Sequence, residues 1–386
     1  MLRIFQQALN SAAFGFMFFT SEVLLILHKR KNMIDYTDDD RLPVTILTGF
    51  LGAGKTTLLN NLIKSNHDNK FAVIENEFGE IPIDNDLIVG IESENIYEMS
   101  NGCICCTLNG ELAELLFDLL NIRHKLTHLI VETTGIADPS TVVQAFMSSE
   151  QIETFYRIDS VVCLVDAKNI KAISADTTLA ARQISYADRI IINKCDLTGD
   201  AELAETEALV RSFNPYAGIF KTSFGNIDQI PVIDTWSYAP PVIEDFSKKA
   251  TGLRPGGSIL QPVGFASIQK HQTPHHDIES HSYTFTRNFD PHKFNFWLDH
   301  LIEYYGGGIY RIKGIISFDK VAQKVVVQSV KEHIMISSGD LWENEERVSR
   351  IIFIGKKLNK LRLEESLIEL LAGDLQRSVS LLSRTN

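Results

Sequence analysis

The sequence predicts an α/β protein: a doubly wound, mainly parallel sheet followed by a smaller α+β domain. The chain has 386 residues, more than a single compact core usually holds. Short apolar runs alternate with amphipathic helical patterns, which is typical of parallel strands covered by helices on both faces. The composition then changes near residue 236 to a stretch rich in proline and glycine. These three observations predict two domains joined by a linker.

The first domain is expected at 42–235. Apolar runs without polar alternation predict buried strands at 43–49, 71–76, 128–135, 160–167 and 189–196. Helical periodicity between these runs predicts helices at 55–65, 110–122 and 201–213. Because strands and helices alternate, we expect the strands to pair in parallel.

The second domain is expected at 282–375, after a linker at 236–281 that is His-rich at its end. Alternation predicts a strand at 282–289. A helix should follow at 290–305, with Asp290 as its N-cap and Pro291 in its first turn. An amphipathic helix at 363–373 should close the domain, which leaves 376–386 as a tail.

Residues 1–41 are predicted to form an N-terminal extension. Its apolar run at 11–31 is too short for a comfortable membrane span, and its basic residues follow the run instead of preceding it as in a signal peptide. We interpret the segment as the product of an upstream start codon, with Met33 as the true first residue and 1–32 untranslated. A membrane-surface anchor and an organellar leader remain the alternatives.

Charge and cysteine usage limit the partners and the compartment. A net charge of −12 without a long basic run argues against a general nucleic-acid binder. Three of the five cysteines are clustered, which does not resemble a disulfide framework. We therefore expect a cytoplasmic protein without an integral membrane role, and its oligomeric state stays open.

The stretch GFLGAGKTT, residues 49–57, has the spacing of a phosphate-binding loop between a strand and a helix. Small residues let backbone N–H groups point at a triphosphate, the lysine adds charge for the β- and γ-phosphates, and the first threonine offers a hydroxyl to Mg²⁺. The predicted nucleotide-binding residues here are Gly49, Gly52, Ala53, Gly54, Lys55, Thr56 and Thr57.

The stretch NKCD, residues 193–196, ends a predicted strand and favours guanine. Asp196 would accept hydrogen bonds from the N1–H and the amine of guanine, a pattern that adenine does not offer. Asn193 would brace the loop and reach N7, and the stem of Lys194 would cover the base. These three residues complete the predicted GTP site.

Acidic residues follow two other predicted strands. Glu132, in VETTG, would bind Mg²⁺ through water or polarise the attacking water, and the N–H of Gly135 would sense the γ-phosphate. With Lys55, they form the predicted catalytic set. The stretch ENEFGE adds three acids that would face Mg²⁺ or a second metal, or else form a solvated loop: Glu75, Glu77 and Glu80.

The stretch GCICC, residues 102–106, offers three thiolates close together. Three protein ligands leave one position open on Zn²⁺, and thiolates also suit Cu(I). Cys103, Cys105 and Cys106 are therefore the predicted transition-metal ligands, with Glu75 and Glu77 as further candidates; packing in a turn and a redox pair are the alternatives. Cys163 is expected to be a packing residue.

Taken in order, these five stretches resemble the CobW family of P-loop GTPases, and the likeness extends over about 42–375. The resemblance implies a GTP-hydrolysing metallochaperone that uses GTP and Mg²⁺ and delivers a transition metal to a client metalloprotein. Zn²⁺ is the expected metal, and Co²⁺ is the alternative. Asn109 stands where many relatives carry Arg. A metal buffer or sensor that uses GTP as a conformational latch is the alternative function.

Four histidines lie close together near the end of the predicted linker: His271, His275, His276 and His281. Histidine clusters often bind metal, so the segment is either a low-affinity loading site or a solvated linker.

Overall fold

The computed structural model describes residues 39–75, 96–99, 108–147, 149–238, 265–272 and 278–373. Contacts divide the chain into units at 1–40 and 41–386, and the second unit is the one described below. The predicted N-terminal extension lies outside the described residues up to position 38, as does the predicted tail. Within the described part of the chain, no helix is long and apolar enough to cross a membrane.

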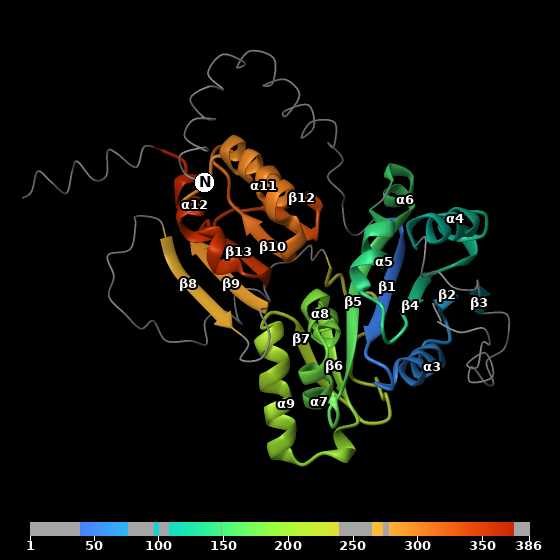
Figure 1. Cartoon of the computed structure of the whole chain (residues 1–386). Coiled ribbons are helices and arrows are strands. Elements are labelled where there is room, and N and C mark those ends of the chain that lie inside the picture. The colour runs from blue at the N-terminus through green and yellow to red at the C-terminus, as the bar shows by residue number, and fades with distance from the viewer. Residues whose placement is uncertain are drawn as a thin grey trace, which may run out of the picture. The chain divides into compact units, whose positions relative to one another are not determined.

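The first domain contains a parallel sheet, as predicted (Figure 1). Its described strands lie in the order β3-β2-β4-β1-β5-β6-β7, and every described pair is parallel. The order reverses on either side of the first strand, which is where doubly wound folds place their ligand site. The strands are β1 (Leu42–Gly49), β2 (Phe71–Glu75), β3 (Ile96–Met99), β4 (His128–Glu132), β5 (Tyr156–Asp166), β6 (Arg189–Asn193) and β7 (Gly218–Lys221).

Helices bury both faces of this sheet, which explains why its strands read as continuous apolar runs. On one face, Leu58, Leu59 and Leu62 pack against strand residues that include Ile130. Its neighbour Val131 belongs to the cluster on the other face, where α4, α5, α8 and α9 pack. The helices are α3 (Lys55–Ser65), α4 (Leu108–Leu120), α5 (Pro139–Phe146), α6 (Glu150–Phe155), α7 (Ile170–Asp176), α8 (Thr178–Tyr186) and α9 (Asp200–Phe213), with short 3₁₀ turns η3 (Arg123–Lys125) and η4 (Cys195–Leu197).

The second domain is built on an antiparallel sheet in the order β12-β11-β10-β13-β9-β8, as described. Its strands are β8 (Phe265–Gln272), β9 (Ile278–Phe285), β10 (Ile309–Ile316), β11 (Gln323–Val330), β12 (His333–Leu341) and β13 (Ser349–Lys356). The remaining elements are α11 (Pro291–Tyr305), α12 (Leu363–Glu369), η5 (Gly306–Gly308) and η6 (Leu358–Leu361). The predicted fold class, a parallel α/β domain followed by a smaller α+β domain, is confirmed.

Helix α11 begins as the sequence predicts. The side chain of Asp290 accepts hydrogen bonds from the backbone N–H groups of His292 and Lys293, each at 3.0 Å. The buried face of the helix then contributes Phe294, whose ring lies 5.4 Å from that of Phe289 and 5.3 Å from that of Phe318. This edge-to-face aromatic cluster fixes the helix on one face of the antiparallel sheet.

The end of the predicted linker is part of this sheet. Strand β8 and the first residues of β9 fall within 236–281, and β9 lies between β8 and β13. His281 is buried, with Nδ1 3.2 Å from the hydroxyl of Tyr283 and Nε2 3.3 Å from Glu279 Oε2. The prediction of a solvated linker is therefore wrong for His281, because β9 buries this residue between β8 and β13. His275 and His276 lie outside the described residues, and so does the side chain of His271.

Because His128, the first residue of β4, is buried, we expect the stability of the protein to fall measurably in acid. Burial, together with the nearby Arg157, lowers the pKa of His128 from 6.5 to about 3. The unfolded chain therefore binds a proton below pH 6.5 that the folded chain takes up only near pH 3, so stability falls as the pH drops through this window. Between pH 7 and 5 this loss amounts to about 2 kcal/mol.

Urea unfolding at pH 7 and pH 5 measures the effect. His128→Gln keeps a polar partner for Thr45, whose hydroxyl lies 2.9 Å from Nε2, and should lose about 2 kcal/mol less than the native protein between the two pH values. The exposed His67 serves as the control, and His67→Gln should retain the native pH dependence. Equal losses in the native and His128→Gln proteins would show that His128 is not kept neutral.

Candidate functional site

The phosphate loop connects β1 to α3, and its glycines are required by its backbone. Gly49, Gly52 and Gly54 have φ angles of 140°, 72° and 100°, which disfavour residues with a Cβ. A Cβ on Gly49 would lie 2.3 Å from the carbonyl oxygen of Leu164, and one on Gly54 would lie 2.5 Å from Nδ2 of Asn193. The loop is therefore wrapped tightly onto the ends of β5 and β6, with α3 beginning at Lys55.

The predicted Mg²⁺ ligands lie together at the edge of the sheet. The hydroxyl of Thr56 donates a hydrogen bond to Oε1 of Glu132 at 3.1 Å, and Glu132 is buried. The register of the sheet pairs Glu75 with Glu132, so the two strands end side by side. A hydroxyl and a carboxylate are the oxygen donors that Mg²⁺ prefers, and the donor set fits this ion.

The loop after β4 returns against the phosphate loop. The hydroxyl of Thr133 donates to that of Thr48 at 3.0 Å, and the Thr133 N–H donates to the carbonyl of Leu47 at 2.9 Å. A Cβ on Gly135 would approach the backbone nitrogen of Leu51 to 2.5 Å. Gly135 thus lies directly beside the phosphate loop, where a larger residue would displace one loop or the other.

Asn193, the last residue of β6, joins two loops. Its Nδ2 donates to the carbonyl of Ala53 in the phosphate loop at 2.9 Å, and its Oδ1 accepts from the N–H of Gly225 at 3.0 Å. The side chain is buried, so it braces the phosphate loop against the segment after β7. Its contact with N7 of guanine stays a prediction.

Lys194 and Asp196 project from a short turn that follows β6. Lys194 has φ 62°, and its Nζ donates to Oδ2 of Asp166 at 2.8 Å. Burial by itself raises the pKa of Asp166, but hydrogen bonds from Lys194 and Asn169 outweigh burial and leave the pKa below its usual value. Asp166 therefore holds the lysine as an ion pair, and Asp196 stays exposed with its backbone N–H bonded to Ser223 Oγ at 3.1 Å.

Three contributors were missed by sequence reasoning: Asp166, Gln183 and Ser223. Asp166 follows an apolar run directly, so an acid at the end of a strand was an available signal. Gln183 and Ser223 carry no such signal, because each acts through a contact with a distant loop. Cys163 is buried in β5, as its predicted packing role requires.

The predicted soft-metal ligands fall outside the described residues: Cys103, Cys105, Cys106, Glu77 and the side chain of Glu75. Glu80, the third acid of ENEFGE, lies outside them as well. The described flanks are informative, because β2 and β3 are parallel and pair Ile74 with Met99. Both strands therefore end at the edge of the sheet that carries Thr56 and Glu132, and the cysteine stretch connects this edge to α4.

The fold and the site define a P-loop GTPase: a phosphate loop at the reversal of a parallel sheet, an oxygen pair that fits Mg²⁺, and an N-K-x-D turn after β6. Residues 43–221 match the family description "CobW/HypB/UreG, nucleotide-binding domain", and residues 278–371 match "Cobalamin synthesis protein cobW C-terminal domain". The chain belongs to the CobW family.

Named relatives agree with this assignment. The chain is 33% identical over 321 residues to the zinc chaperone YjiA of Escherichia coli, covering 82% of this chain and 95% of YjiA. It is 35% identical over 200 residues to zinc-regulated GTPase metalloprotein activator 1 of Schizosaccharomyces pombe, covering 50% of this chain and 49% of that protein. The crystal structure of Zn(II)-bound YjiA GTPase from E. coli superposes with a TM-score of 0.61 at 26% identity, covering 86% of this chain and 99% of that one.

Proposed function

We propose that this GTPase is a metallochaperone that binds Zn²⁺ at Cys103, Cys105 and Cys106 and delivers it to a client metalloprotein. The topology of the parallel sheet supports the proposal: β3, the strand that precedes the cysteine stretch in the sequence, ends at the same edge of the sheet as β2 and β4, where Thr56 and Glu132 meet. Relatives named as zinc chaperones support zinc over cobalt. A thiolate site with an open position suits uptake followed by release.

In the proposed reaction, the groups of the site bind the nucleotide, hold Mg²⁺ and position the attacking water. Lys55 and the backbone of the phosphate loop bind the triphosphate, and Asp196 and Asn193 select guanine. Thr56 and Glu132 would hold Mg²⁺, which neutralises charge that develops on the phosphate oxygens. Glu132 also orients the attacking water, and the Gly135 N–H donates to the γ-phosphate.

Nucleotide and metal are expected to influence each other. If GTP orders the segments that follow β2 and β4, the affinity for metal depends on the nucleotide. Reciprocity then requires that bound metal changes GTP affinity by the same factor.

Titration of Zn²⁺ against a competing chelator, with and without a non-hydrolysable GTP analogue, tests the proposal. The variant Cys103→Ala/Cys105→Ala/Cys106→Ala should lose at least roughly 1,000-fold in zinc affinity, because three thiolates supply most of the binding energy. Cys195→Ala, which lies outside the cysteine stretch, should bind zinc as the native protein does. A triple variant with native zinc affinity would refute the assigned ligands.

The alternative, a metal buffer or sensor, is distinguished by turnover. Single-turnover GTP hydrolysis with and without Zn²⁺ should show a metal-dependent rate in the native protein and none in the triple variant. If the protein binds zinc but hydrolyses GTP at a negligible rate both with and without the metal, the result would favour the buffer or sensor instead.

A further inference from the structure

The loop after β4 is hydrogen-bonded to α8 through Gln183. Nε2 of Gln183 donates to the carbonyl of Gly135 at 3.3 Å and to that of Ala137 at 3.1 Å, and Gln183 is buried. Ile136, between them, is 47% exposed, so its own side chain adds little packing to this loop. The hydrogen bonds from Gln183 therefore act together with the close approach of Gly135 to Leu51 in setting how Gly135 faces the phosphate loop.

Asp138 ends the loop and faces two cations from different domains. Its Oδ1 caps α5 by accepting from the N–H of Ser140 at 3.0 Å. Its Oδ2 lies 3.6 Å from Arg182 of α8 and 3.5 Å from Nζ of Lys331. Lys331 belongs to the C-terminal domain, in the turn between β11 and β12, where it has φ 52°.

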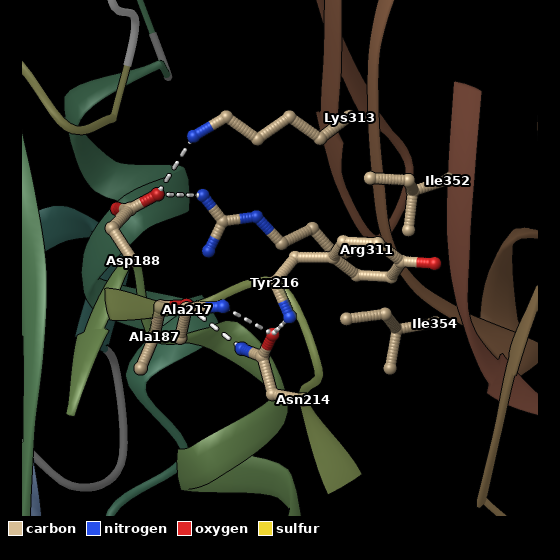
Figure 2. Close-up of a pocket in the computed structure, with 9 residues that line it drawn as sticks. All are labelled: Ala187, Asp188, Asn214, Tyr216, Ala217, Arg311, Lys313, Ile352 and Ile354. Carbon is tan, nitrogen blue, oxygen red and sulfur yellow. Dashed lines mark hydrogen bonds and ion pairs between the residues drawn. The ribbon is translucent and has the colours of Figure 1, made fainter. Parts of the chain in front are cut away.

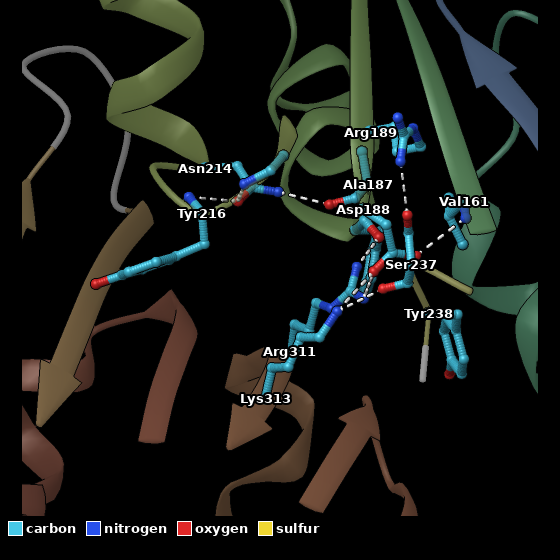
Figure 3. Close-up of polar contacts among 12 residues, drawn as sticks. Val161, Ala187, Asp188, Arg189, Asn214, Tyr216, Ser237, Tyr238, Arg311 and Lys313 are labelled. Carbon is cyan, nitrogen blue, oxygen red and sulfur yellow. Dashed lines mark hydrogen bonds and ion pairs between the residues drawn. The ribbon is translucent and has the colours of Figure 1, made fainter. Parts of the chain in front are cut away.

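A buried ion pair next to this turn sets the position of the C-terminal sheet. Arg311 of β10 donates to Asp188 and to the carbonyl of Tyr186, the last residue of α8, and Lys313 lies 3.2 Å from Asp188 (Figure 3). Arg311 and Asp188 are both buried. The register pairs Arg311 with Val330, so the anchoring residue adjoins Lys331 across two strands.

The interface beside this anchor includes a small cavity of about 40 Å³. Figure 2 shows Arg311 and Lys313 reaching from the C-terminal sheet toward Asp188 past Tyr216 and the apolar Ile352 and Ile354. Dense cores resist displacement, whereas an interface held by polar contacts can shift when one charge changes. The loop is thus coupled to the C-terminal domain through a small number of charges.

We propose that Lys331 is a positioning residue for GTP hydrolysis. Through Asp138, the C-terminal domain holds the loop at 133–138 in the orientation in which the Gly135 N–H faces the γ-phosphate. The inference rests on the role proposed above for Gly135. In this proposal, the ion pair between Lys331 and Asp138 makes the rate of GTP hydrolysis depend on the C-terminal domain, which supplies none of the proposed nucleotide-binding residues.

Steady-state kinetics of the full chain test this inference. Lys331→Ala should lower kcat about threefold to tenfold with the KM for GTP unchanged, because a partly exposed ion pair is weak and acts on positioning alone. Lys331→Arg restores the charge and should restore kcat. Lys320 is the matched control, since it is an exposed lysine with φ 61° in the turn at the other end of β11, and Lys320→Ala should keep the native kcat.

Three outcomes would overturn the inference. The first is equal kcat values for Lys331→Ala and Lys320→Ala. The second is a kcat that Lys331→Arg fails to restore, which would indicate a structural role for the native lysine. The third comes from Gly135→Ala: if it hydrolyses GTP at the native rate, the loop is not catalytic and the inference falls with that assignment. Loss of activity in Gly135→Ala with native kcat in Lys331→Ala would reject only the coupling to Lys331.

Discussion

Replacing Asp196 with Asn is expected to change the preferred nucleotide from GTP to xanthosine triphosphate. The predicted role of the Asp196 carboxylate is to accept hydrogen bonds from both the N1–H and the amine of guanine, whereas an amide would present a donor to that amine. Losing two charge-assisted hydrogen bonds, each worth about 1.5 kcal/mol, should weaken GTP binding roughly 100-fold. Xanthine carries a carbonyl where guanine carries the amine, so the new amide N–H can donate to it while the amide oxygen accepts from N1–H.

Competition binding with labelled GTP, xanthosine triphosphate and ATP measures this switch. Asp196 is exposed and lies in the 3₁₀ turn η4 that follows β6, so its replacement leaves the core intact. Asp200→Asn, in the first turn of α9, provides a control of the same chemistry outside the turn and should keep the native preference. If Asp196→Asn still preferred GTP over xanthosine triphosphate, the N-K-x-D turn would not be the guanine-reading element.

The second large effect is expected from Glu132→Gln, which should lower kcat by about 100- to 1,000-fold while nucleotide affinity changes little. The change removes a negative charge beside the hydroxyl of Thr56, 3.1 Å away, but keeps the size of the side chain. A preorganised electrostatic group of this kind commonly contributes about 3 kcal/mol to the transition state. A higher Mg²⁺ concentration should also be needed for half-maximal activity.

Single-turnover hydrolysis across a Mg²⁺ titration gives both quantities. Thermal unfolding serves as the folding control, and the midpoint should not fall, because a neutral amide is less costly to bury than a carboxylate. Glu150→Gln, in the first turn of α6, should hydrolyse GTP at the native rate. A kcat for Glu132→Gln within threefold of native would exclude Glu132 from the hydrolysis step.

Local periodicity and motif spacing were sufficient for the elements that build the nucleotide site. The predicted helix at 55–65 coincides with α3, and the predicted strand at 43–49 differs from β1 by one residue. Both predictions rest on short-range rules: apolar periodicity, a glycine-rich turn and the hydroxyl that follows the lysine. The N-cap at Asp290 was predictable for the same reason, because a cap acts on N–H groups two and three residues away.

Contacts between distant residues were not predictable in this way. Asn193 bonds the carbonyl of Ala53, and Lys331 reaches Asp138, in both cases across more than a hundred positions of sequence. His281 reads as part of a polar linker until β8 and β13 are placed on either side of it. Each of these contacts depends on the order of strands in a sheet, which periodicity does not specify.

For this protein, the sequence by itself predicted which residues bind GTP, Mg²⁺ and a soft metal, because these chemistries need particular side chains at short spacings. Tertiary structure alone decided how the loops that carry them are braced, through Asn193, Gln183 and the ion pairs of Asp138 and Asp188. The physical reason is distance: a motif is read within a few residues, whereas bracing requires two segments that only the folded sheets bring together.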